Sequence, residues 1–286
     1  MLKRSELCAP LVVAVVVAIG CGGSPSTSLG APSRAESRDG GKPQDASATT
    51  NTGTADKPMQ VAEAPSGAAP VAAAGSASIQ GTVRFDGTAP APEKIKMDAD
   101  PVCQQQHATP VYAEGVVVDA NGALKNVLVY VKEGAKGPFA TPSSPVVLNQ
   151  AGCWYTPHVF GIQVNQPLEI VNSDPTLHNV NAKPTANPPF NVAQPSKGMK
   201  TTKKFTTTEV GVKFKCNVHP WMHAYATVLE HPYFGVSGAD GSFAITGLPS
   251  GTYVIEAWHE KLGTQTQTVT VGDGESTSIA FTFKGQ

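Results

Sequence analysis

A short segment in the C-terminal half of the chain carries three side chains that bind soft metal ions. The run 212–215 alternates apolar and basic residues as Val-Lys-Phe-Lys, which predicts a strand followed by Cys216 on its core side. His219 and Met222 follow at a spacing of three residues each. A thiolate, an imidazole and a thioether therefore converge in one tight loop.

A mononuclear copper centre of the blue type takes two imidazoles and a thiolate in a near-trigonal arrangement, with a weak axial thioether. The loop supplies one imidazole, so the second must come from elsewhere in the chain. The best source is His178, in a polar loop that follows the apolar run 168–171. We therefore predict one copper ion held by His178, Cys216, His219 and Met222.

The remaining histidines offer alternatives. His223 could replace the thioether as fourth ligand, although the spacing favours Met222. His158 follows Tyr-Thr-Pro at a predicted strand start, and we interpret it as structural. His231 and His259, together with Glu260, would form a second metal site if their strands were neighbours. Ordinary hydrogen-bonded histidines are the preferred interpretation.

Short strands are the elements that must position these side chains. After residue 77 the sequence consists of alternating runs bounded by Gly, Pro and Asn, without a helical period of useful length. We therefore predict an all-β folded part. The main runs are 79–85, 126–131, 168–171, 212–216, 241–257, 269–271 and 279–283.

The order of the motifs resembles the cupredoxins. An apolar strand leads to Asn-x-Asp at 172–174 and His-Asn-Val at 178–180, and Cys-x2-His-x2-Met follows at 216–222. This short ligand loop is most similar to that of the amicyanins. The resemblance implies a Greek-key sandwich over residues 145–230 with one type 1 copper ion. Under it the ligands are His178, Cys216, His219 and, axially, Met222.

The same resemblance implies roles for residues around the ligands. Asn179 would join the two ligand loops by hydrogen bonds near Asn217. Pro220 and Trp221 would belong to an apolar docking patch. An edge of His219 would be exposed in that patch as the exit for electrons.

Two further stretches, 78–144 and 231–286, flank the cupredoxin-like unit. The second contains Gly-Ser-Phe-Ala-Ile-Thr-Gly-Leu-Pro-Ser-Gly-Thr-Tyr at 241–253, which resembles the carboxypeptidase-regulatory-like (transthyretin-like) β-sandwich. The resemblance implies two parts of one accessory sandwich. We therefore expect a cupredoxin sandwich inserted in, or packed against, a regulatory-like sandwich.

The N-terminal residues have the features of an export signal. Residues 1–20 contain a basic start and a short apolar core before Cys21, which is typical of a secretory signal peptide. The sequence Ala-Ile-Gly-Cys at 18–21 resembles a bacterial lipobox, so Cys21 is the expected lipidation site; a plain signal peptide is the alternative. Residues 21–77 are rich in Ser, Pro, Thr, Ala and Gly, which predicts a disordered tether.

These features predict a protein of the cell envelope, bound to the membrane through its lipid anchor. Gly rather than Asp follows the cysteine, which favours the outer membrane, facing either the periplasm or the cell surface. Without residues 1–20 the chain has 19 basic and 21 acidic residues. This near-neutral charge balance does not indicate nucleic-acid binding.

The cysteines outside the ligand loop suggest a disulfide. Cys8 would leave with the signal peptide and Cys21 would carry the lipid. If Cys216 binds metal, Cys103 and Cys153 are the remaining pair, in a compartment where disulfides persist. Two free buried thiols are the alternative.

Electron transfer with an unknown redox partner protein is the function that the predicted site favours. A copper enzyme would need further metals, commonly held by His-x-His pairs, and none occurs among the seven histidines. We therefore expect no enzymatic activity. The alternative is a copper-binding, copper-delivery or surface-interaction lipoprotein without a redox role.

Overall fold

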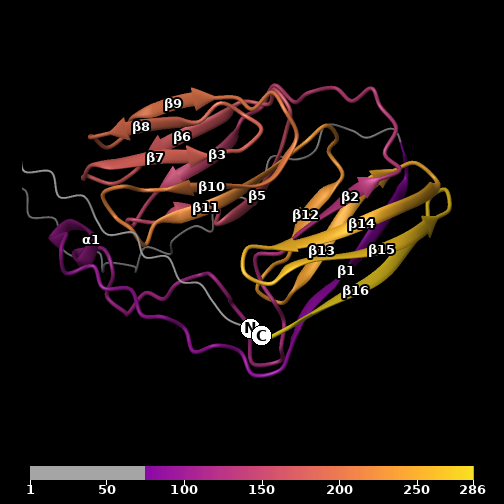
Figure 1. Ribbon diagram of the computed structural model, residues 1–286, viewed down its shortest axis with the longest axis horizontal. Coiled ribbons are helices and arrows are strands. Elements are labelled where there is room, and N and C mark those ends of the chain that lie inside the picture. Colours follow the sequence, from indigo (N-terminus) through magenta and orange to yellow (C-terminus); the bar gives the residue numbers. More distant parts are fainter. Residues whose placement is uncertain (1–74, 286) are drawn as a thin grey trace, which may run out of the picture. The chain divides into compact units, whose positions relative to one another are not determined.

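The computed structural model describes residues 75–285 (Figure 1). Strands dominate this part of the chain, and its one helix has five residues, so the predicted all-β class is confirmed. The predicted signal peptide (1–20), Cys21 and nearly all of the tether (21–77) lie outside the described residues. Within the described part, no helix is long and apolar enough to cross a membrane.

One sandwich consists of two sheets, with strand orders β13-β1-β16 and β12-β2-β14-β15. Alternate residues of these strands face inward, and they form an apolar core that includes Ile79, Ile255 and Phe281. The strands are β1 (Ala77–Asp86), β2 (Leu128–Glu133), β12 (Phe234–Val236), β13 (Ser242–Leu248), β14 (Gly251–His259), β15 (Gly263–Val271) and β16 (Ser276–Lys284).

A second sandwich has the strand orders β5-β11-β10-β7-β8 and β4-β3-β6-β9. Its separate core includes Leu148, Ile170 and Phe214, and Cys216 and Met222 lie in the same cluster. The strands are β3 (Val146–Gln150), β4 (Tyr155–Thr156), β5 (Val159–Gln163), β6 (Leu168–Asn172), β7 (His178–Lys183), β8 (Phe190–Gln194), β9 (Lys200–Lys203), β10 (Glu209–Lys215) and β11 (His223–Leu229).

The chain order shows how the sandwiches are connected. Strands β1 and β2 precede the second sandwich, and β12 to β16 follow it. The second sandwich is therefore inserted between two parts of the first. A small third cluster joins Leu128 and Tyr130 of β2 to Val159, Tyr225 and Leu229 of the insert. The regulatory-like identity of the first sandwich stays a prediction.

The helix α1 (Pro101–Gln105) was not expected from the sequence. Asp100 caps it, and Pro101 occupies its first turn, a combination that favours helix initiation. Five residues are too few to show a helical period. Met97 and Cys103 pack against the core of the second sandwich, although we assigned the whole range 78–144 to the first sandwich.

His231 and His259 are structural residues of the first sandwich. His231 Nε2 lies 2.8 Å from the carbonyl oxygen of Val131. His259 is 1% exposed, and its Nδ1 accepts the backbone N–H groups of Lys261 and Leu262. Neither takes part in a group of possible metal ligands within the described residues.

The burial of His259 predicts a loss of stability in acid. Burial lowers the pKa of His259 from 6.5 to about 4, so the folded state stays neutral while the unfolded chain takes up a proton. Stability is therefore full above pH 6.5 and falls between pH 6.5 and 4, by about 3 kcal/mol in total. Urea unfolding at several pH values should show a shallower pH dependence for His259→Gln. Equal slopes for the two proteins would contradict this assignment.

Candidate metal centre

Strand pairing brings the predicted ligands together. β10 pairs antiparallel with β7, and Lys215 lies opposite Asn181, so the end of β10 lies beside the start of β7. His178 is the first residue of β7, and Cys216 directly follows β10. The loop 216–222 then connects β10 to β11 and places His219 over the same end of the sandwich.

Three donor atoms of the predicted set converge in a buried space. The Nδ1 atoms of His178 and His219 lie 2.9 Å apart, and Cys216 Sγ lies 3.9 Å from His219 Nδ1. One candidate ligand atom from each of these three residues lies within 4.8 Å of the other two. None of the three residues is more than 2% exposed.

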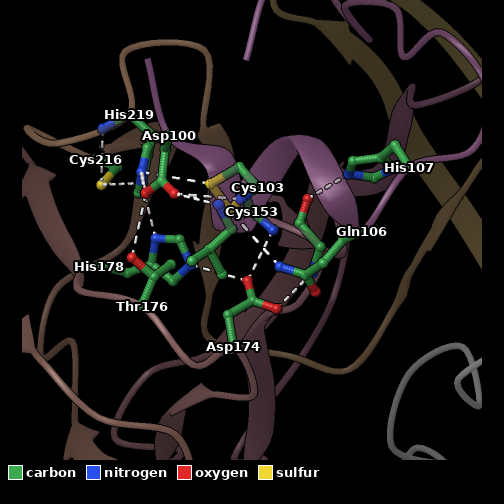
Figure 2. Close-up of a disulfide and its surroundings, with 12 residues drawn as sticks. Asp100, Cys103, Gln106, His107, Cys153, Asp174, Thr176, His178, Cys216 and His219 are labelled. Carbon is green, nitrogen blue, oxygen red and sulfur yellow. Dashed lines mark hydrogen bonds and ion pairs between the residues drawn. A yellow bond between two sulfur atoms is a disulfide. The ribbon is translucent and has the colours of Figure 1, made fainter. Parts of the chain in front are cut away.

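The outer edges of both imidazoles face carboxylates (Figure 2). His178 Nε2 lies 2.8 Å from Asp174 Oδ2, and His219 Nε2 lies 2.9 Å from Asp100 Oδ2. Each Nε2 therefore carries the hydrogen in the neutral tautomer, which leaves a lone pair on each Nδ1. Two facing lone pairs at 2.9 Å repel each other unless a proton or a metal ion lies between them.

The surroundings favour a thiolate at Cys216. Burial alone would raise the pKa of Cys216, but hydrogen bonds with His178 and His219 outweigh it and lower the pKa to about 5. Burial would likewise lower the pKa of His178, whereas Asp174 and Cys216 raise it to about 9. The backbone N–H of His219 also points to the sulfur, at 3.4 Å. The thiolate is the form that binds a metal.

Asn179 connects the two ligand loops, as the family resemblance implies. Its Oδ1 accepts the backbone N–H of Asn217 at 2.7 Å and lies 3.4 Å from Cys216 Sγ. Asn181 donates to the side chain of Asn217 at 3.1 Å, and the hydroxyl of Tyr155 donates to the carbonyl of Asn179. These bonds fix the two loops against each other.

Met222 closes the ligand loop and is fully buried. Its N–H donates to the carbonyl of His219, and its carbonyl accepts the N–H of Cys216, both at 3.0 Å. The rival ligand His223 faces a different group, because its Nε2 lies 3.9 Å from Glu260 Oε1. Met222 therefore stays the predicted fourth ligand.

The expected exposed edge of His219 is wrong. His219 is only 2% exposed, because the segment around α1 covers its Nε2 edge with Asp100. In the predicted docking patch, Pro220 is exposed and Trp221 is half-buried. The ring of Trp221 lies 5.1 Å from that of His219, and its Nε1 donates to the carbonyl of Cys153.

A disulfide holds the segment around α1, which we call the cover of His219, in place. Cys103 in α1 is bonded to Cys153, the pair that elimination among the cysteines suggested. Figure 2 shows the disulfide beside His219, with Cys103 Sγ 3.5 Å from His219 Nε2. Asp100 also receives hydrogen bonds from Thr176 and from the first turn of α1. The cover is therefore hydrogen-bonded to both ligand loops and is linked to Cys153 by the disulfide.

Sequence analysis missed the roles of Asp100 and Asp174. Burial would raise the pKa of Asp174, but hydrogen bonds from His178 and from the backbone of Cys153 and Gly152 keep it below its usual value. Asp174 was visible within the Asn-x-Asp motif, four residues before His178. Asp100 carried only a local signal, the Asp-Pro start of a helix.

The donor chemistry fits copper. Two imidazole nitrogens and a thiolate in one dry space, with a buried thioether in the same loop, are the set that blue copper sites use. The fixed tautomers direct both Nδ1 atoms to the same point. The structure thus contains a His/Cys group that could hold a metal, and its donors match the predicted cofactor.

No protein-family model matches the sequence, and no curated protein is significantly similar to it. Among solved structures, similar ones include a copper-containing nitrite reductase from Thermus scotoductus SA-01, at 25% identity and a TM-score of 0.28 over 33% of this chain. The match spans only 24% of that reductase. A reduced amicyanin variant matches at 19% identity and a TM-score of 0.27, over 35% of this chain and 97% of its own. A purple cupredoxin from Nitrosopumilus maritimus matches at 21% identity and a TM-score of 0.26, over 30% and 98%.

Proposed function

We propose that this protein is a one-electron carrier with a single type 1 copper ion held by His178, Cys216, His219 and Met222. One observation carries the proposal: two buried imidazoles, fixed by carboxylates, face each other through Nδ1 at 2.9 Å beside a cysteine with a low pKa. Copper bound there would supply one-electron chemistry by alternating between Cu(I) and Cu(II).

The protein's own residues keep the donors in place. Asp100 and Asp174 hold the outer edges of the imidazoles, and Asn179 ties the loop of Cys216 to β7. A ligand set that does not move between oxidation states lowers the reorganisation required for electron transfer. The burial of all the proposed ligands also excludes water and substrates, which favours electron transfer over catalysis.

The cover over His219 changes the proposed docking surface. Two apolar side chains lie near the centre, the exposed Pro220 and the half-buried Trp221. Trp221 packs beside His219 and donates a hydrogen bond to the carbonyl of Cys153. A redox partner protein would therefore dock on Pro220 and Trp221, and electrons would pass beside the covered imidazole.

An optical spectrum tests the proposal. The full chain, loaded with copper and oxidised, is expected to show the intense visible absorption of a thiolate-bound copper and a reversible one-electron couple in voltammetry. A colourless protein that gives up copper readily to a chelator would instead support copper delivery. A protein that retains no copper after dialysis would exclude both functions.

Asp100 is expected to tune the reduction potential. Its carboxylate lies 2.9 Å from His219 Nε2, so its negative charge favours the more positive Cu(II) state. Asp100→Asn should raise the potential, by roughly 40 mV for a charge interaction of about 1 kcal/mol. The exposed Asp98 on the same segment gives the matched control Asp98→Asn, which should leave the potential unchanged. A lower potential in Asp100→Asn would contradict the assigned role.

The proposed location is the cell envelope, with the outer membrane preferred. Lipid on Cys21 would hold the carrier at a membrane, and the segment 21–77 would link it to the folded sandwiches. Mass spectrometry of the N-terminal peptide should find a diacylglycerol-modified Cys21. Cys21→Ala should release the protein from the membrane fraction, and continued membrane attachment of this variant would contradict the anchor.

A further inference from the structure

A second group of metal-binding side chains lies away from the first centre. His158 lies directly before β5, His223 begins β11, and Glu260 follows β14. The first two belong to the inserted sandwich and the third to the other sandwich. The side chains of His158 and Glu260 are each 2% exposed, and that of His223 is 22% exposed.

The donor atoms of this group point at one another. Glu260 Oε1 lies 2.5 Å from His158 Nε2 and 3.9 Å from His223 Nε2. Candidate ligand atoms of the three residues all lie within 4.8 Å of one another. The second oxygen, Glu260 Oε2, is buried and has no hydrogen-bond partner among the residues that the structure describes. A buried carboxylate oxygen without a partner is costly.

The tautomer of His223 adds a second unpaired acceptor. His223 Nδ1 lies 3.0 Å from the carbonyl oxygen of Trp221, so the hydrogen is on Nδ1 and a lone pair is on Nε2. That lone pair faces the carboxylate of Glu260. A cation between the two groups would satisfy both.

Tyr225 and Glu114 are the other groups beside these three side chains. Tyr225 packs its ring against both imidazoles, at 5.9 Å and 6.0 Å between centroids. Burial, the charge of Glu260 and a hydrogen-bond interaction with that carboxylate raise the pKa of Tyr225, so its phenol stays neutral beside Glu260. Glu114 Oε2 lies 3.9 Å from His158 Nδ1, which is beyond hydrogen-bond distance, and its negative charge favours a hydrogen on that nitrogen.

We propose that His158, His223 and Glu260 bind a divalent first-row transition-metal cation, of which zinc suits the two nitrogens and one oxygen best. Zinc bonds of about 2.0–2.2 Å in a tetrahedron place the donors about 3.3 Å apart. His158 Nε2 and Glu260 Oε1 would therefore move apart from 2.5 Å, and His223 Nε2 would move closer to Glu260 from 3.9 Å. His223 and Lys261 also line a surface pocket of about 630 Å³, which gives a cation access. The fourth position would hold water or a ligand from that pocket.

The bound cation would join the two sandwiches. Two of its ligands come from the insert and the third from the turn after β14, so metal binding would add a bond across the small apolar contact of β2 with β5 and β11. The site needs neither Cys216 nor the first metal. Its presence is therefore independent of the proposed electron transfer.

Zinc titration of the copper-loaded full chain tests the proposal. Equilibrium dialysis followed by elemental analysis should find one zinc ion per chain beside the copper. Glu260→Gln and His223→Ala should each weaken zinc binding by about tenfold or more. The matched controls are Glu230→Gln, at an exposed carboxylate, and His107→Ala, at an imidazole bonded to the carbonyl of Gly152. Both controls should bind zinc like the unmodified chain.

Two results would overturn the second site: an unmodified chain that binds no zinc beside its copper, or equal zinc affinities in Glu260→Gln, His223→Ala and the controls. The first result does not depend on whether the variants fold. Cys216→Ser separates this proposal from the first, because that variant should lose the copper colour and still bind zinc. In either overturning case, the His158–Glu260 contact would be only a structural ion pair or hydrogen bond.

Discussion

Replacing Cys216 by serine is expected to abolish the visible absorption of the copper-loaded protein while both sandwiches stay folded. The absorption of a blue copper site requires the thiolate, because it arises from charge transfer between sulfur and copper. Serine has nearly the same shape, and Asn179 Oδ1 and the N–H of His219 remain as hydrogen-bond partners for its hydroxyl. Near-ultraviolet circular dichroism would check the fold.

Met222→Leu provides the matched comparison for this result. Leucine conserves the volume of the buried side chain, and the backbone bonds of residue 222 to Cys216 and His219 do not depend on the side chain. The two imidazoles and the thiolate remain, so the colour should persist while the reduction potential shifts. A coloured Cys216→Ser protein would refute the thiolate ligand, and a colourless Met222→Leu protein would show that the thioether is essential for binding.

The ligands that could be predicted from the sequence alone are those that lie close together along the chain. Cys216, His219 and Met222 lie within seven residues on a strand end and its loop, so alternation and spacing suffice to place them together. His178 required the family resemblance, because the pairing of β7 with β10 is not visible in either segment alone. The strand pattern likewise predicted the fold class, since the runs are short, many of them alternate, and turn residues bound them.

The parts that escaped prediction depend on contacts between distant segments. Asp100 reaches His219 across 119 residues of sequence, and nothing near Asp100 indicates that partner. The burial of His219 follows from the same contact, which is why the exposed edge implied by the resemblance was wrong. The group of His158, His223 and Glu260 combines residues from both sandwiches. Sequence analysis had paired Glu260 with other histidines, His231 and His259.

Removing the disulfide is expected to have the largest effect on stability. The bond between Cys103 and Cys153 joins residues separated by 50 positions, and closing a loop of that size stabilises by about 4 kcal/mol in the chain-entropy model. The double variant Cys103→Ala with Cys153→Ala should therefore unfold at a clearly lower urea concentration. Alanine at these two buried positions also removes packing from the core of the second sandwich.

The same double variant should release copper faster. Helix α1 has only five residues, so it depends on its attachment to the sandwich rather than on its own hydrogen bonds. Without the disulfide, the hydrogen bonds that Asp100 accepts from His219 and Thr176 would still attach the segment to the sandwich. When these bonds open, the Nε2 edge of His219 becomes accessible to water and to chelators.

The rate of copper transfer to a strong chelator measures this opening. Asp100→Asn is the matched comparison, because it keeps the disulfide and alters the contacts of residue 100 with His219 and Thr176. If the disulfide holds the cover, the double variant should lose copper faster than Asp100→Asn, and both should lose it faster than the unmodified chain. Equal release rates in the double variant and the unmodified chain would show that the packing of Met97 and the contacts of Asp100 hold the cover without the disulfide. The disulfide would then contribute to the stability of the fold but not to the protection of the copper ligands.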